Sequence, residues 1–292
     1  MKRIITLFLL SILLLSSCTS NSSSQSSSDS AAAYIENKGS DTIVNLALAW
    51  AEKYQSDHPD VRISVTGGGS GTGIAALVNG TVDLANASRK IKDEEISEAQ
   101  ANGVTPDEHN IARDAIADIV NPNNPVSKLT LQQISDIYSG KYTNWNEVGG
   151  EDRPIVRLSR ETNSGTHVYF LETVLRLGSK EDKTLFSTNT LLLPSSEGII
   201  SEVRDNPNAI GYDGLGYVPD DLKMVAIAEE EGGAYVLPSI DTVNDKSYAI
   251  ARDLYMYTNG DPAGIVKEYL DWILSDEAQQ IVAELGFVPV LK

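Results

Sequence analysis

The chain contains few of the residues that covalent and metal-based sites require. Its 292 residues include one cysteine and three histidines. One cysteine cannot form a disulfide within the chain, and the three histidines are scattered without the His-x-x-x-His spacing of a zinc site. A chain of this length can fill two domains with cores that are stable without disulfides or metals. The composition therefore predicts a two-domain protein with no metal and no cofactor.

Basic residues are also scarce. Lysine and arginine together number 23 against 41 acidic residues, and the formal net charge is −18. This charge argues against a nucleic-acid-binding surface, because phosphate backbones are recognised by clustered lysine and arginine. It also opposes long-range attraction of small anions. Any anion site in this chain must then depend on local dipoles and on one or two arginines.

One long apolar run lies at the N-terminus. Two basic residues precede the run from Ile4 to Leu15, which is shorter than the roughly 20 residues that a membrane-spanning helix needs. This arrangement indicates a secretion signal over residues 1–17. The run ends in Leu-Ser-Ser-Cys, which resembles the lipobox of bacterial lipoproteins, where cleavage leaves the cysteine as the lipidated N-terminus. An ordinary signal peptide with an incidental Cys18 is the alternative.

The segment after Cys18 is poor in apolar residues. From Thr19 to Ser30 it is mostly serine with asparagine and glutamine, a composition that cannot offset the entropy lost on ordering. Residues 18–32 are therefore predicted to be a lipidated cysteine and a flexible tether. The globular body begins near Ala33 and is predicted to be extracytoplasmic and anchored to the membrane by the lipid.

Five glycines between Thr66 and Ile74 connect an expected strand with an expected helix. Val61, Ile63 and Val65 alternate with polar residues before the loop, and apolar residues resume at helical spacing after it. Glycine lets a ligand approach the backbone N–H groups closely, and the first turn of a helix has unpaired donors and a partial positive charge. The loop therefore suits an anion. A tight turn that binds nothing is the alternative.

Two further strand–loop–helix junctions have the same plan. Residues 160–166 (Arg-Glu-Thr-Asn-Ser-Gly-Thr) follow an apolar run and precede a helical pattern. Arg160 could donate two hydrogen bonds to a tetrahedral oxyanion, while Ser164 and Thr166 add hydroxyl groups. Residues 39–42 (Gly-Ser-Asp-Thr) also precede a helical pattern, and they either contact a ligand or only cap the helix.

Strand and helix patterns alternate along the body. This alternation predicts an α/β fold whose mostly parallel sheets are covered on both faces. The apolar runs 111–120 and 248–257 are each interrupted by charged residues, and we interpret them as two crossover strands between two lobes. The predicted lobes are residues 33–114 with 253–292, and residues 115–252.

In their order along the chain, these motifs resemble the extracytoplasmic phosphate-binding proteins of bacterial phosphate ABC transporters, in their short lipoprotein form. The resemblance covers nearly all of the body. The segments that carry it are 39–42, 66–74, 82–89, 143–145, 160–166, 210–212, 271–275 and 286–289. It implies a two-lobed periplasmic-binding-protein fold of type II, with phosphate bound in the cleft and delivered to ABC permease subunits for import. A monomer is expected.

Position by position, the resemblance assigns phosphate contacts to loops of both lobes. The residues that it implies are Ser40, Asp41, Thr42, Ser70, Ser88, Arg89, Arg160, Ser164, Gly165 and Thr166.

The chain departs from the family pattern after the strand that ends at Ser88. Well-studied relatives have an aspartate there, which accepts the proton of phosphate, whereas this chain has Arg89. A structural salt bridge from Arg89 to Asp93 or Glu94 is the alternative. The proton acceptor is therefore unassigned, and Asp41 is the one carboxylate in a matching loop that could take the role.

A second departure concerns Arg160. The same relatives pair their cleft arginine with an aspartate two residues later, where this chain has Thr162. Glu161 does not replace it, because neighbours on a strand point to opposite faces. Arg160 therefore lacks the orienting partner that the family pattern implies.

Two other functions fit parts of the sequence. The same fold could bind sulfate or molybdate, since the expected aspartate is absent. Ser70 and Ser164 lie in glycine contexts that also occur in serine hydrolases and phosphatases, but residues 68–72 lack the closing glycine of a Gly-x-Ser-x-Gly motif. His167, the one histidine near either serine, is expected to face outward. The sequence therefore predicts a binding protein and not an enzyme.

Overall fold

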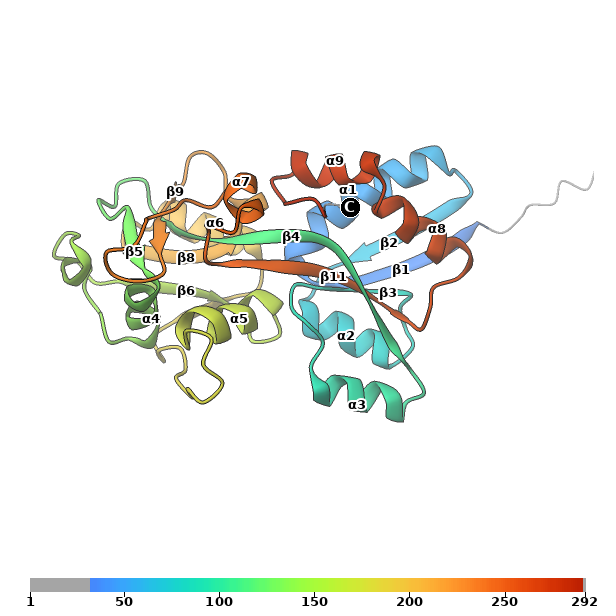
Figure 1. The fold of residues 1–292 in the computed structure, drawn as a ribbon, viewed down its shortest axis with the longest axis horizontal. Helices are drawn as coiled ribbons and strands as arrows, with labels where there is room; N and C mark the ends of the chain where they lie inside the picture. Colours follow the sequence, from blue (N-terminus) through green and yellow to red (C-terminus); the bar gives the residue numbers. More distant parts are fainter. Residues whose placement is uncertain (1–31, 291–292) are drawn as a thin grey trace, which may run out of the picture. The chain divides into compact units, whose positions relative to one another are not determined.

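Two long strands connect two groups of helices and strands in residues 32–290, the part of the chain that the structure, a computed structural model, describes. They are β4 (Pro106–Val120) and β11 (Ala251–Asn259), which pair in antiparallel fashion. Figure 1 shows both strands running from one group of elements into the other. The two predicted crossovers are therefore confirmed. The predicted signal, Cys18 and nearly all of the tether lie outside the described residues.

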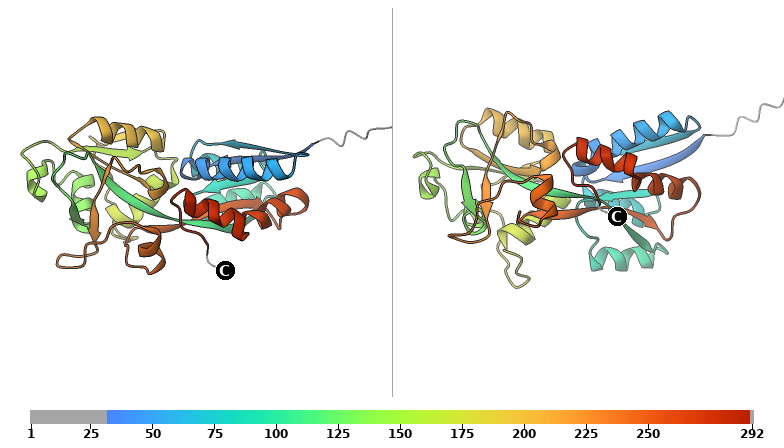
Figure 2. Two further views of the ribbon diagram at one scale, coloured as in Figure 1. Left: turned by 90° about the horizontal axis from the view of Figure 1, so that it is seen from above. Right: turned by 45° about the horizontal axis from the view of Figure 1, so that its top comes forward.

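The first lobe combines the first strand–loop–helix units with the end of the chain. The indole of Trp50 donates a 2.9 Å hydrogen bond to the carbonyl of Ala278, and the helices that carry these residues, α1 and α9, pack side by side (Figure 2). The elements of this lobe are β1 (Ala33–Gly39), α1 (Asp41–Asp57), β2 (Val61–Thr66), α2 (Ser70–Val78), β3 (Leu84–Ala87), α3 (Asp93–Ala101), α8 (Gly264–Ile273) and α9 (Asp276–Glu284).

The second lobe is built from the middle of the chain. Its core includes Trp145, which is buried, and the rings of Phe170 and Tyr212, which stack with centroids 3.6 Å apart. Its elements are β5 (Lys128–Thr130), α4 (Leu131–Ser139), the 3₁₀ helix η1 (Trp145–Val148), β6 (Val156–Arg160), α5 (Gly165–Phe170), the π-helical turn η2 (Leu171–Leu175), β7 (Leu191–Leu193), α6 (Ser196–Asp205), β8 (Ala209–Gly214), the 3₁₀ helix η3 (Leu215–Tyr217), β9 (Lys223–Met224), β10 (Ala226–Ala228) and α7 (Ile240–Asn244).

Nine strands from both lobes form one sheet in the order β2-β1-β3-β11-β4-β8-β6-β7, with β9 pairing to β4, while β5 and β10 pair in a separate sheet of two strands. Pairing is parallel between β1 and its neighbours β2 and β3, and between β6 and its neighbours β7 and β8. The crossover strands pair in antiparallel fashion with their neighbours, β11 with β3 and β4 with β8. They are also antiparallel to each other, since β11 returns the chain in the direction opposite to β4. The α/β class is confirmed, and the prediction of mostly parallel pairing holds inside each lobe only.

Each crossover contributes buried apolar residues to both cores, to one core before its midpoint and to the other core after it. On β4, Ala112 belongs to a core cluster of the first lobe and Ala115 to one of the second. On the return, Ile250 packs in the second lobe and Leu254 in the first. These changes lie close to the predicted lobe boundaries, while the boundaries themselves stay a prediction.

Candidate functional site

Three helix N-termini meet where the lobes face each other. In the first lobe, α1 begins directly after Ser40 and α2 begins at Ser70, while α5 of the second lobe begins directly after Ser164. The amide of Gly71 donates a 3.1 Å hydrogen bond to the carbonyl of Asn163, so the glycine loop and the α5 junction touch. Helix N-termini carry unpaired N–H donors and a partial positive charge. The predicted strand–loop–helix junctions are thus brought to one place.

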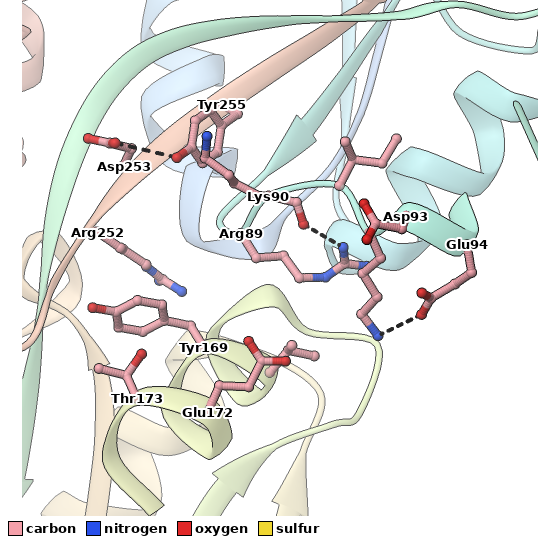
Figure 3. A pocket seen from close by; sticks show the side chains of 13 residues that line it. Arg89, Lys90, Asp93, Glu94, Tyr169, Glu172, Thr173, Arg252, Asp253 and Tyr255 are labelled. Carbon is pink, nitrogen blue, oxygen red and sulfur yellow. Dashed lines mark hydrogen bonds and ion pairs between the residues drawn. The ribbon is translucent and has the colours of Figure 1, made fainter. Parts of the chain in front are cut away.

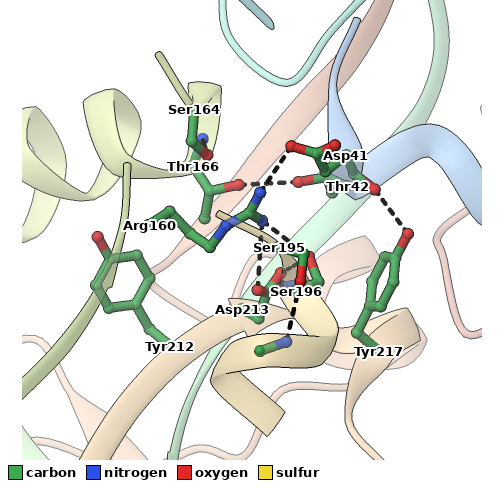
Figure 4. Close-up of polar contacts among 12 residues, drawn as sticks. Asp41, Thr42, Arg160, Ser164, Thr166, Ser195, Ser196, Tyr212, Asp213 and Tyr217 are labelled. Atoms are coloured by element: carbon green, nitrogen blue, oxygen red, sulfur yellow. Dashed lines mark hydrogen bonds and ion pairs between the residues drawn. The ribbon is translucent and has the colours of Figure 1, made fainter. Parts of the chain in front are cut away.

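Five hydroxyl groups gather at this place, and we call them the hydroxyl cluster: Ser40, Thr42, Ser70, Ser88 and Thr166. Ser40 Oγ donates to Ser88 Oγ at 2.9 Å, and Ser88 Oγ lies 3.2 Å from Ser70 Oγ. The hydroxyls of Thr42 and Thr166, which come from opposite lobes, are 2.9 Å apart (Figure 4). All five residues are at most 1% exposed. Buried polar groups are costly unless they are hydrogen-bonded, and these hydroxyls meet that requirement by bonding to one another. Hydroxyls that lie beside helix N-termini are also the kind of donors that bind an oxyanion.

Gly165 allows α5 to approach the hydroxyl cluster. A β-carbon at this position would lie 2.3 Å from Ser70 Oγ and 2.5 Å from Ser88 Oγ, which is closer than real atoms approach. Ser164 caps the same helix, since its Oγ accepts a 3.2 Å hydrogen bond from the amide of Thr166. The structure therefore places Ser164 and Gly165 directly beside the predicted serines of the first lobe.

Arg160 lies beside the hydroxyl cluster, but its terminal N–H groups are directed at other acceptors. Its Nη2 donates to Asp41 Oδ2 at 2.8 Å and to the carbonyl of Pro194 at 3.0 Å. Its Nη1 donates to Ser196 Oγ at 2.9 Å and lies 3.6 Å from a carboxylate oxygen of Asp213. Figure 4 shows this guanidinium between the two carboxylates. The orienting partner that the sequence lacks two residues after Arg160 is supplied from the opposite lobe by Asp41.

Both carboxylate oxygens of Asp41 have partners. While Oδ2 accepts from Arg160, Oδ1 accepts a 2.9 Å hydrogen bond from the amide of Gly68 in the glycine loop. The hydroxyl of Tyr217 donates to the backbone carbonyl of Asp41 at 2.6 Å. Asp41 thus connects Arg160 to the glycine loop, and its role as an acceptor of the phosphate proton stays a prediction.

Arg89 is not brought into the hydroxyl cluster. Its two terminal nitrogens donate to Glu95 at 2.8 and 2.7 Å, and Glu95 also accepts from the amide of Lys92 at the start of α3. Burial opposes ionisation of Glu95, but the hydrogen bonds from Arg89 and Lys92 outweigh it and lower its pKa. The salt bridge is therefore the alternative that the structure realises, with Glu95 in place of Asp93 or Glu94. Because Glu95 engages both terminal nitrogens of Arg89, we do not include Arg89 in the proposed site, and its contact with phosphate stays a prediction.

His167 faces inward, so its predicted outward orientation is wrong. Its Nδ1 lies 2.9 Å from the carbonyl oxygen of Arg160 and 3.0 Å from Ser159 Oγ. The short helix α5 contacts β6, and this turns the side chain of His167 toward the strand. Burial lowers the pKa of the imidazole, although the carbonyl of Arg160 acts in the opposite direction. Among the described residues, no hydrogen bond joins His167 to Ser164.

Two residues of the crossover strands reach the hydroxyl cluster without having been predicted. Arg252 on β11 donates through Nη2 to Thr166 Oγ1 at 2.9 Å and through Nη1 to the carbonyl of Ser88 at 3.0 Å. Asp114 on β4 accepts from the same Nη2 at 3.0 Å. In the sequence, Arg252 and Asp114 were visible as charged residues that interrupt apolar strands. We interpreted these interruptions only as evidence for crossover strands and not as candidate site residues.

A cavity of about 650 Å³ opens beside Arg252, between residues of the two lobes. Figure 3 shows the guanidinium of Arg252 and the side chain of Arg89 at its wall, with Glu172 facing them from the second lobe. The lining carries charges of both signs. Its charged residues are Arg89, Lys90, Lys92, Asp93, Glu94, Glu172, Arg252 and Asp253.

Comparison with known sequences assigns the chain to a superfamily. The model of the PBP superfamily domain matches residues 24–277. The phosphate-binding protein PstS of Pseudomonas aeruginosa is 33% identical over 273 residues, which are 88% of this chain and 83% of that protein. The phosphate-binding protein PstS of Bacillus subtilis is 32% identical over 262 residues, which are 89% of this chain and 82% of that protein.

Solved structures show the same fold. A phosphate ABC transporter substrate-binding protein from Clostridium perfringens, crystallised with bound phosphate, superposes with a TM-score of 0.79 at 36% identity and covers 88% of this chain and 100% of its own. An ABC-type phosphate transport receptor from Vibrio cholerae has a TM-score of 0.70 at 31% identity, with coverage of 88% and 100%. The two-lobed type II fold is therefore confirmed, and the chain belongs to the PBP superfamily and, within it, to the family of the phosphate-binding proteins PstS.

Proposed function

We propose that this chain binds inorganic phosphate with high affinity outside the cytoplasmic membrane and delivers it to an ABC permease for import. The observation that carries the proposal is the hydroxyl cluster, whose buried groups come from both lobes. Four of its five residues lie at the starts of α1, α2 and α5, and the fifth, Ser88, directly follows β3. Hydroxyl groups and helix N-termini donate hydrogen bonds to oxyanions. The similarity to the phosphate-binding proteins PstS of P. aeruginosa and B. subtilis supports phosphate as the oxyanion.

The proposed ligand contacts come from both lobes. Phosphate would lie among the hydroxyl cluster and the start of α5, where Ser164 and Gly165 stand. Arg160 would contribute by exchanging one of its present acceptors for a phosphate oxygen. Asp41 is retained as the proposed carboxylate of the site, because it touches both Arg160 and the glycine loop.

We propose binding without chemical conversion of the ligand. A serine hydrolase needs a histidine within hydrogen-bonding reach of its nucleophile. Ser164 Oγ instead accepts from a backbone amide, and the ring nitrogen of His167 faces Ser159 and the carbonyl of Arg160. Within residues 32–290 there is also no group of three or more side chains suited to hold a metal ion. These contacts support a receptor over a hydrolase or phosphatase.

We further propose that Cys18 carries a lipid and that the serine-rich tether holds a monomeric binding body at the membrane surface. Support comes from the sequence of residues 4–30. None of the helices between residues 32 and 290 is both long and apolar enough to cross a membrane. Replacing Cys18 by alanine should release the chain from membranes without changing its phosphate affinity. A variant that still sediments with membranes after a salt wash would contradict the anchor.

Calorimetric titration of the purified chain with phosphate and, separately, with sulfate tests the proposed function. We expect saturable binding of one phosphate per chain and no comparable binding of sulfate. Tight binding of sulfate or molybdate without phosphate would instead favour the same fold with another oxyanion. Turnover of a chromogenic phosphate ester would favour an enzyme.

A further inference from the structure

Arg252 and Asp114 face each other across the two crossover strands. The strands pair these residues directly, and Asp114 Oδ2 accepts from Arg252 Nη2 at 3.0 Å. The Arg252 side chain is 3% exposed and that of Asp114 is fully buried. Burial raises the pKa of Asp114 to about 6, with Arg252 acting in the opposite direction. The carboxyl group is therefore mostly ionised at neutral pH, and it fixes the position of the arginine.

The guanidinium of Arg252 is bonded to groups of both lobes inside the hydroxyl cluster. Its Nη2 donates to the hydroxyl of Thr166 at 2.9 Å and lies 3.3 Å from that of Thr42. Its Nη1 donates to the carbonyl of Ser88 at 3.0 Å. The ring of Tyr169 lies under the guanidinium, with its centroid 5.5 Å from the central carbon. Arg252 therefore stands at the point where the threonine hydroxyls of the two lobes meet.

The balance of charge around the two arginines favours Arg252 as the cation that faces a ligand. Arg160 is paired with two carboxylates, Asp41 and Asp213, and its terminal N–H groups are all directed at protein acceptors. Arg252 is paired with one carboxylate. A guanidinium has five N–H donors. Nε lacks a hydrogen-bond partner among the described residues in both arginines, so the difference lies in the terminal nitrogens. Nη1 of Arg252 donates to one acceptor within residues 32–290, the carbonyl of Ser88, whereas Nη1 of Arg160 faces both Ser196 and Asp213.

We propose that Arg252 contacts the bound oxyanion directly, with Asp114 as its counterion. The inference rests on the proposed phosphate-binding function and adds to that site a cation carried by a crossover strand. An oxygen of phosphate takes up hydrogen bonds from the guanidinium and from the hydroxyls of Thr42 and Thr166. The net charge of −18 means that the surface does not attract an anion. A buried cation that touches the hydroxyl cluster would supply the positive charge that a bound anion requires.

Arg252 could contact the ligand or could serve only to neutralise Asp114, and three variants distinguish these two roles. Arg252→Lys keeps the charge opposite Asp114, so the fold should be retained, but it removes the planar fork of the guanidinium. The double variant Asp114→Asn with Arg252→Gln removes both charges together, so no buried charge is left unpaired. Arg89→Gln is the matched control, because Arg89 lines the same cavity but is bonded to Glu95.

Thermal melting first verifies that the three variants fold. Calorimetric titration of each full-length variant with inorganic phosphate then measures its affinity for phosphate. The double variant should bind phosphate at least about tenfold more weakly than the wild type, since charged hydrogen bonds are lost. Arg252→Lys should be weakened about threefold or more, and Arg89→Gln should stay close to the wild type. If the double variant and Arg252→Lys bind phosphate as tightly as the wild type, Arg252 acts only as the counterion of Asp114 and the inference is overturned. A wild-type chain that binds no phosphate would overturn the proposed function itself.

Discussion

Short side chains at the hydroxyl cluster allow the two lobes to come into direct contact there. Serine and threonine bring oxygen atoms close to the backbone, and Gly165 brings the start of α5 onto Ser70 and Ser88. A larger residue at any of these positions would hold the lobes apart, because interiors are close-packed. Residue size at this junction is therefore as important to the proposed site as residue polarity.

Replacing Gly165 by alanine should weaken phosphate binding by about tenfold or more while leaving the fold intact. The added methyl would lie 2.3 Å from Ser70 Oγ, so the serine or the helix must shift, and overpacking of this kind typically costs about 1 to 3 kcal/mol. Titration calorimetry measures the affinity. Gly198→Ala in α6 is the matched control, because a β-carbon there meets its nearest neighbour at 3.4 Å, an ordinary contact. Equal affinities for both variants would contradict the close approach of α5.

The contacts that the sequence could not reveal join residues far apart in the chain. The serines and threonines of the site lie in short glycine-containing motifs, so local pattern was sufficient to select them. Arg160 finds its partner Asp41 in the other lobe, and Arg252 finds Thr166. Such pairs depend on how the lobes fold together. The salt-bridge partner of Arg89 was missed for a related reason, because its pairing with Glu95 depends on how α3 begins.

At the scale of elements, β4 carries two buried carboxyl groups with different surroundings. Asp114 is paired with Arg252, whereas Asp118 lies farther along the strand without a hydrogen-bond partner for either carboxyl oxygen within residues 32–290. Asp118 is fully buried, and burial raises its pKa well above the ordinary value. An unpaired buried charge is expensive. Asp118 is therefore expected to keep its proton in the folded chain.

Asp118→Asn should raise the free energy of unfolding relative to the wild type, and the gain should be larger at pH 7 than at pH 4. An acid with a raised pKa in the folded state binds its proton more tightly there. Its contribution to stability is thus greatest at low pH and is lost as the pH rises above the unfolded pKa of about 4 toward the folded pKa. Asparagine has no such titration. Urea denaturation at the two pH values measures the difference, with the exposed Asp220→Asn as control. A gain that does not depend on pH would contradict a protonated Asp118.

Regular elements were predicted best where apolar periodicity was strong. The pattern alone predicts the strand with Val61, Ile63 and Val65, which is β2, and the crossover role of β4 and β11. The direction of strand pairing was predicted less well. The apolar pattern of a buried strand does not indicate whether the neighbouring strand runs parallel or antiparallel to it. The inward turn of His167 was missed because α5 is short and its packing on β6 decides which face is buried.

At the scale of the molecule, direct contacts between the lobes surround the hydroxyl cluster. Thr42 meets Thr166, Arg160 pairs with Asp41, and the amide of Gly71 donates to Asn163. A ligand that bonds to groups of both lobes stabilises this arrangement by mass action. Binding of phosphate would therefore be coupled to the contact between the lobes, which is the state that a permease could recognise.

A crystal structure of the chain grown with phosphate would show directly which residues contact the ligand. We expect one phosphate between the lobes, within hydrogen-bonding distance of Ser70 from the first lobe, of Thr166 from the second, and of Arg252 from the crossover strand. A phosphate found only in the cavity between Lys92 and Glu172, or contacts made by one lobe alone, would contradict this expectation.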